Sequence, residues 1–176
     1  LAKEMGILTV AVVTKPFPFE GRRRMQVALK GIEELSQHCD SLITIPNEKL
    51  ITVLGRNATM IQAFRAANDV LQGAVQGIAD LIVRPGLINV DFADVRTVMK
   101  DGGSAIMGTG IGRGENRAVD AAKMAIESPL LDSVTIAGAR GVLINITGGN
   151  EMTLGDVNTI SDIVKEAVGE ECEIIF

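Results

Sequence analysis

The longest regular hydrophobic pattern in the chain covers residues 60–83. Apolar positions recur there at the spacing of a helix, and a polar row lies opposite them. The apolar row consists of Met60, Phe64, Ala67, Leu71, Val75, Ile78 and Ile82. A second apolar row widens this sector, so the pattern predicts one long helix buried between two layers. Arg84-Pro85-Gly86 is expected to end the helix, because proline disfavours helix at the residue before it.

Two continuous apolar runs precede this helix, at residues 7–14 and 41–45. Both are rich in β-branched residues, which is typical of strands buried on both faces of a parallel sheet. Residues 22–39 repeat apolar positions at helical spacing, so the three segments predict a right-handed βαβ unit. Ligands of such sheets bind at the carboxyl ends of the strands, which here correspond to residues 15–24 and Pro46-Asn47.

The remaining predicted elements are shorter. Helices are expected over residues 48–54, 95–100, 116–127 and 154–168, and strands over 104–107, 135–136, 141–147 and 173–176. The first half of the chain therefore reads as α/β, and the second half as α+β.

The composition narrows the class of function. A formal net charge of -5 over 176 residues and a pI near 4.9 argue against nucleic acid or an anionic membrane as the main partner. Two cysteines and one histidine provide neither a disulfide framework nor a metal site, so we expect no bound metal and a reducing, cytoplasmic environment. No apolar run reaches the length of a membrane span. Since the chain begins at Leu1 and ends inside a strand-like run, we expect an internal piece of a longer protein.

The most conspicuous local motif is the glycine-rich segment GTGIGRG at residues 108–114, between a predicted strand and a predicted helix. The spacing of a dinucleotide-binding loop fails at Arg113, and Glu115 occupies the helix start where a phosphate would bind. We therefore favour a tight structural turn over a phosphate loop. A nucleotide-dependent oxidoreductase built on this segment is the alternative that the motif alone leaves open.

Polar residues at three other places are candidates for chemistry. Asp91 and Asp94 follow the end of the long helix, where they either cap the next helix or orient water or a cation. An arginine triplet, residues 22–24, lies with Glu20 at the ligand-facing end of the first strand and is either solvated or a binding group for phosphate and ribose. Asn68, at the edge of the polar row of the long helix, either lines a pocket or is solvated.

Taken together, several segments resemble the FtsZ family of the tubulin superfamily. They are VVTKPFPFEGRRR, SLITIPNEKL, AFRAANDVLQGAVQGI, NVDFADVRTVM and GARGVLINITGG, in this order and spacing, and the resemblance covers essentially the whole chain. It implies the back half of a Rossmann-like GTPase domain at residues 1–57, a central helix at 58–83, and a synergy loop with a truncated activation domain at 84–176. The glycine-rich phosphate loops would precede Leu1, and a C-terminal tail would follow Phe176.

The resemblance also implies roles for particular residues. Glu20 and Arg24 would contact ribose and phosphate, and Phe64 would pack on guanine. Asn47 and Asn68 would contact the nucleoside; many relatives have Asp in place of Asn68, whose amide still offers an acceptor. Asn89, Asp91 and Asp94 would enter the nucleotide site of the neighbouring subunit and position the attacking water.

The function so implied is that of a GTPase, acting on GTP with Mg²⁺, which polymerises head to tail into filaments of the bacterial division ring. Its partners would be further copies of itself, and division proteins that bind the absent tail, without nucleic acid or direct membrane insertion. The fragment alone is not expected to bind GTP tightly. The alternative is a non-catalytic tubulin-like filament or interaction module, in which Asp91 and Asp94 serve only as helix caps.

Overall fold

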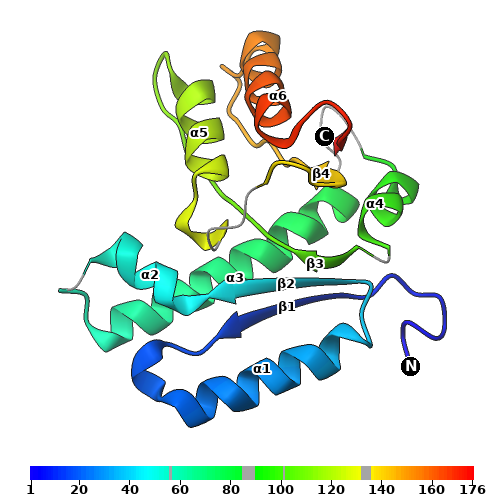
Figure 1. Cartoon of the computed structure of the whole chain (residues 1–176). Coiled ribbons are helices and arrows are strands. Elements are labelled where there is room, and N and C mark those ends of the chain that lie inside the picture. Colours follow the sequence, from blue (N-terminus) through cyan, green and yellow to red (C-terminus); the bar gives the residue numbers. More distant parts are fainter. Residues whose placement is uncertain (56, 85–89, 101, 132–135) are drawn as a thin grey trace. The chain divides into compact units, whose positions relative to one another are not determined.

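The computed structural model divides the chain into two compact units (Figure 1), which are described separately. It describes residues 1–55, 57–84, 90–100, 102–131 and 136–176. Unit 1 comprises Leu1–Arg84 and Met99–Met107, and unit 2 comprises Pro85–Val98 and Gly108–Phe176. The long helix thus belongs to unit 1. The chain also returns to unit 1 at Met99–Met107, within the segment that the sequence assigns to the activation domain.

Unit 1 contains a parallel sheet in the order β1-β2-β3, formed by β1 (Val10–Lys15), β2 (Ser41–Pro46) and β3 (Gly103–Ala105). The predicted βαβ unit is confirmed, with α1 (Arg22–Ser36) connecting β1 to β2. Lys15 is in register with Pro46, so both strands end at the same edge of the sheet.

Two predicted strands of unit 1 have different limits in the structure. The first begins at Val10 rather than at residue 7, because the preceding Thr9 bonds to Asp40: its N–H donates to the Asp40 carboxylate at 2.8 Å, and its carbonyl accepts from the Asp40 N–H at 2.7 Å. The strand expected over residues 104–107 is β3, which ends at Ala105 and pairs with β2 instead of joining the second half of the chain.

The long helix is α3 (Met60–Val83), which follows η1 (Pro18–Glu20) and α2 (Asn47–Leu54) in the chain. Its first turn is fixed by a capping box, in which the Thr59 hydroxyl accepts from Gln62 N–H and the Gln62 amide oxygen accepts from Thr59 N–H. In Figure 1, α1 and α3 lie along opposite faces of the sheet.

The predicted buried face of α3 is wrong in its details. The buried residues are Ala63, Ala67 and Ala74, whereas Phe64 and Val75 are 42% and 53% exposed. The physical reason is that α3 packs closely on β1 and α2 through small side chains. A helical wheel reports how wide the apolar sector is, but not which of its rows makes the contact.

Unit 2 contains the remaining elements: α4 (Phe92–Met99), which extends one residue beyond it, α5 (Arg117–Ile126), η2 (Pro129–Leu131), β4 (Gly141–Leu143), α6 (Leu154–Val168) and β5 (Glu173–Ile175). β4 and β5 pair in parallel, and α5 packs against α6. The predicted helix over residues 154–168 is confirmed at both ends. The predicted strand over 141–147 is shorter, because its register with β5 ends at the pair Leu143 and Ile175. None of the helices in the described part of the chain has the length and apolarity that a membrane crossing requires.

An ion pair joins α5 to the start of α6. Arg117 Nη2 and Nε lie 2.7 and 3.2 Å from the same carboxylate oxygen of Asp156. That oxygen also accepts from the N–H and the hydroxyl of Thr153, the residue that caps α6. The hydrogen bond from the Thr153 N–H, followed by that from Arg117, lowers the pKa of Asp156.

Asp156→Asn is expected to lower the melting temperature at pH 7, and the difference from the parent is expected to shrink in acid. Because the pKa of Asp156 is lowered in the folded state, the unfolded chain binds the proton more readily. The stabilisation is therefore present above about pH 4, the ordinary value for Asp, and is lost as the pH falls through the folded pKa. Thermal unfolding from pH 7 to pH 2 measures this, with the exposed Asp162→Asn as control; a difference that is constant with pH would contradict it.

Candidate functional site

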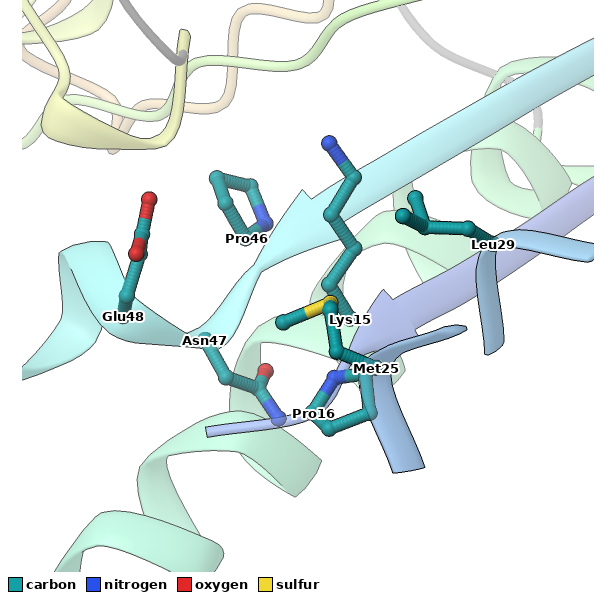
Figure 2. Close-up of a pocket in the computed structure, with 7 residues that line it drawn as sticks. All are labelled: Lys15, Pro16, Met25, Leu29, Pro46, Asn47 and Glu48. Atoms are coloured by element: carbon teal, nitrogen blue, oxygen red, sulfur yellow. The ribbon is translucent and has the colours of Figure 1, made fainter. Parts of the chain in front are cut away.

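A pocket of about 230 Å³ lies at the carboxyl ends of β1 and β2 in unit 1 (Figure 2). Its lining residues are Lys15, Pro16, Met25, Leu29, Pro46, Asn47 and Glu48. They come from the ends of the two strands, from one face of α1 and from the first turn of α2. The pocket therefore lies at the edge where the sequence predicts ligand binding.

Asn47 is the most unusual residue of this pocket. It is only 5% exposed, and its amide oxygen has no hydrogen-bond partner among the described residues. In Figure 2 its side chain points toward Pro16, away from Glu48. A buried acceptor without a partner is unfavourable, so this oxygen is available to a hydrogen-bond donor that enters the pocket.

Two of the predicted binding residues, Glu20 and Arg24, lie close together after β1, at the end of η1 and in the first turn of α1. Glu20 accepts a hydrogen bond from Phe17 N–H at 2.9 Å and forms an ion pair with Arg24 Nε at 3.1 Å. The carboxylate is largely buried, whereas the Arg24 side chain is 71% exposed. Because the Arg24 side chain is exposed, its guanidinium can turn toward an anion, and Glu20 then keeps the Phe17 N–H as its partner.

Phe64 lies beside this loop, on the first turns of α3. Its ring forms edge-to-face contacts with the rings of Phe17 and Phe19, whose centroids are 5.3 and 6.2 Å away. Asn68 follows one helical turn later and is exposed, so it shares a face of α3 with Phe64. The sequence reasoning missed Phe17 and Phe19. Their signal is the alternation of proline and phenylalanine in KPFPFE, directly after a strand.

Of the predicted catalytic residues, Asp91 and Asp94 belong to unit 2. Asn89 lies outside the described residues. Asp91 caps α4: its carboxylate accepts from Ala93 N–H at 3.0 Å, and its carbonyl accepts from Asp94 N–H and Val95 N–H. Asp94 is exposed, and its carboxylate has no hydrogen bond or ion pair within the described part of the chain. Asp91 thus has a structural role, while nothing in the packing of α4 requires the carboxylate of Asp94.

The glycines of the segment GTGIGRG have a packing role. A Cβ on Gly108, Gly110 or Gly112 would overlap the backbone carbonyl of Ala125, Ala121 or Arg117 of α5, respectively. These carbonyls are four residues apart, or about 6 Å along the helix, which nearly equals the roughly 6.6 Å that two residues of an extended chain span. Every second residue must therefore be glycine where the segment runs antiparallel to α5. This is an extended contact rather than the predicted tight turn.

Two family profiles match different parts of the chain. Residues 1–55 match "Tubulin/FtsZ family, GTPase domain", and residues 103–176 match "FtsZ family, C-terminal domain". The cell division protein FtsZ of Coxiella burnetii is 61% identical over all 176 residues, which are 46% of that protein. FtsZ of Pseudomonas aeruginosa is 57% identical over 174 residues, covering 99% of this chain and 44% of that protein. The chain spans a little under half the length of these curated relatives.

Solved structures agree with these matches. "FtsZ dimer, empty" from M. jannaschii superposes with a TM-score of 0.94 at 46% identity, over 99% of this chain and 50% of that one. CetZ from Methanosaeta thermophila reaches a TM-score of 0.66 at 19% identity, over 99% of this chain and 49% of that one, which shows a common fold alone.

The fold and the first profile define part of a tubulin-type GTPase domain. The chain belongs to the FtsZ family of cell-division proteins within this class. This membership, together with the packing role of the glycines, rules out the oxidoreductase alternative.

Proposed function

We propose that the protein binds and hydrolyses GTP and polymerises into filaments of the division ring, with the pocket at the ends of β1 and β2 as part of its nucleotide site. The observation that carries this proposal is the buried, unpaired amide oxygen of Asn47 in that pocket. A guanosine offers several N–H and O–H donors that fit such an acceptor. The match to a GTPase-domain family supports GTP as this nucleotide.

We assign different parts of the nucleotide to the predicted site residues. Asn47 and Asn68 bind the nucleoside, and Phe64 stacks on the base. Glu20, held by Phe17 N–H, takes ribose hydroxyls, while the exposed Arg24 turns from Glu20 toward phosphate. No three acidic, histidine or cysteine side chains in the described ranges are grouped to hold a metal, so Mg²⁺ would be held mainly by the phosphates and water.

Catalysis is completed by Asn89, Asp91 and Asp94 of a neighbouring subunit. Two observations support this. From Phe64, α3 carries the chain roughly 29 Å along its axis to Val83 before the acids follow. Both acids then belong to unit 2, whereas the pocket residues belong to unit 1. The similar M. jannaschii protein has been solved as an FtsZ dimer, which is consistent with self-association.

A second candidate function is a non-catalytic filament or interaction module. The capping role of Asp91 favours it, since that residue has a structural reason to be present. The carboxylate of Asp94, which has no partner among the described residues, favours the catalytic proposal. Both candidate functions are compatible with division proteins that bind a C-terminal tail and with a location at the division site.

Asn47→Leu is expected to weaken GDP binding about tenfold or more while leaving the nucleotide-free protein as stable as before or slightly more stable. Leucine has nearly the same size, and it removes a buried acceptor that only the ligand satisfies. GDP titration and thermal unfolding of a full-length protein carrying this segment measure both effects. Asn158→Leu, at an exposed position of α6, is the matched control. Unchanged GDP affinity would contradict the assignment of the pocket.

A further inference from the structure

Phe17 is the largest fully buried side chain in the described part of unit 1, although it lies in a loop. Its ring is only 1% exposed. It stacks on Phe19, with centroids 5.1 Å apart and an interplanar angle of 12°, and meets Phe64 edge to face, at 5.3 Å and 81°. Offset stacks and edge-to-face pairs are the favourable geometries for aromatic rings.

The backbone of Phe17 holds a second group of the site. Phe17 N–H donates to the Glu20 carboxylate at 2.9 Å, and Phe17 C=O accepts from Glu20 N–H at 3.0 Å. These two bonds close η1 and orient Glu20. One residue is therefore bonded to the acid of the β1 loop and packed against an aromatic ring of α3, which comes much later in the chain.

We propose that Phe17 is a positioning residue of the nucleotide site, which sets the orientation of the Phe64 ring and fixes its distance from the Glu20 carboxylate. This inference rests on the proposed function of the pocket. Phe64 is itself 42% exposed, so part of its ring is open to a base while another part contacts Phe17. An exposed ring without this restraint would sample several rotamers, and part of the binding free energy would go into ordering it.

The test is a double-mutant cycle in a full-length protein carrying this segment, with GDP affinity as the readout. Phe17→Leu removes the ring contact but keeps the N–H that holds Glu20. It is expected to weaken GDP binding about fivefold. In a Phe64→Leu background the same change is expected to alter the affinity less than about twofold, because there is no ring left to orient. For GTP turnover, KM is expected to rise without a change in kcat.

The control for a purely structural effect is Leu42→Ala, which opens the core of β2 away from the aromatic rings. All affinities are measured at a temperature at which circular dichroism shows every variant folded. If Leu42→Ala weakens binding as much as Phe17→Leu, or if Phe17→Leu costs the same in both backgrounds, the positioning role is overturned. If Phe64→Leu alone leaves GDP affinity unchanged, the proposed contact between Phe64 and the base is wrong. This single variant therefore tests the base contact separately from the positioning role of Phe17.

Discussion

Asp94→Ala in a full-length protein carrying this segment is expected to keep its GDP affinity and to lose GTP turnover by at least about 100-fold. A side chain that orients or deprotonates an attacking water typically contributes a factor of that size or more. The Asp94 carboxylate is exposed and makes no hydrogen bond or ion pair in the described ranges, so its removal should not disturb α4 beyond a small helix-dipole effect. Turnover at saturating GTP, compared with GDP titration, separates catalysis from binding.

Asp120→Ala is the matched control, because Asp120 is an exposed acid in the first turn of α5 in the same unit. It should change neither binding nor turnover. Asp91→Ala differs from both, since it also removes the cap of α4 and should cost about 1 kcal/mol of stability. Turnover unaffected by Asp94→Ala would favour the non-catalytic module.

A mixture of two variants tests whether the acids of one subunit act in the nucleotide site of its neighbour. Asp94→Ala keeps an intact pocket, and Asn47→Leu keeps intact acids, so each variant lacks what the other retains. At a GTP concentration too low to saturate Asn47→Leu, each variant alone should turn over little GTP. If the site is assembled between subunits, the mixture should regain part of that turnover. Turnover per subunit of the parent should also rise steeply with protein concentration. Turnover that is independent of concentration, without rescue in the mixture, would place a complete site in each chain.

Gly110→Ala is expected to destabilise unit 2 by about 3 kcal/mol or more. The added Cβ would overlap the carbonyl oxygen of Ala121, which is backbone inside α5 and has no rotamer with which to move away. Overpacking of this kind typically costs about 1 to 3 kcal/mol, and the higher values belong to rigid neighbours. Since α5 packs on α6, the shift would spread through both helices. Chemical denaturation followed by circular dichroism measures it.

Gly149→Ala is the control for this substitution. Gly149 lies in the same unit, without a positive φ, and a Cβ there would meet no atom within 4 Å. Its replacement should change stability by less than about 0.5 kcal/mol. If Gly110→Ala is equally mild, the segment is not held against α5 as described. The same change should leave GDP affinity intact at temperatures where the protein is folded, because the glycines belong to unit 2 and the pocket to unit 1.

Much of the secondary structure follows from local pattern. The helix α6 has the predicted ends because Thr153 and Asp156 form a capping box at one end, and Gly169 has a positive φ at the other. Two apolar runs around a helix sufficed to predict the parallel pair β1 and β2, and with it the edge that holds the pocket. Asn47 was predicted from the FtsZ resemblance and from this edge, whereas its unpaired buried oxygen is a property of the fold alone.

The sequence by itself determined the element types, the family and the edge of the sheet at which the pocket lies. These depend on backbone periodicity and on residues near one another in the chain. Only the tertiary structure decided that α3 packs through Ala63, Ala67 and Ala74, that Phe17 contacts Phe64, and that the glycines of residues 108–112 follow α5. Each of these contacts joins segments that local pattern does not connect. Close packing of the whole unit decides which rows of side chains meet. The local sequence pattern of either packed segment does not contain that information.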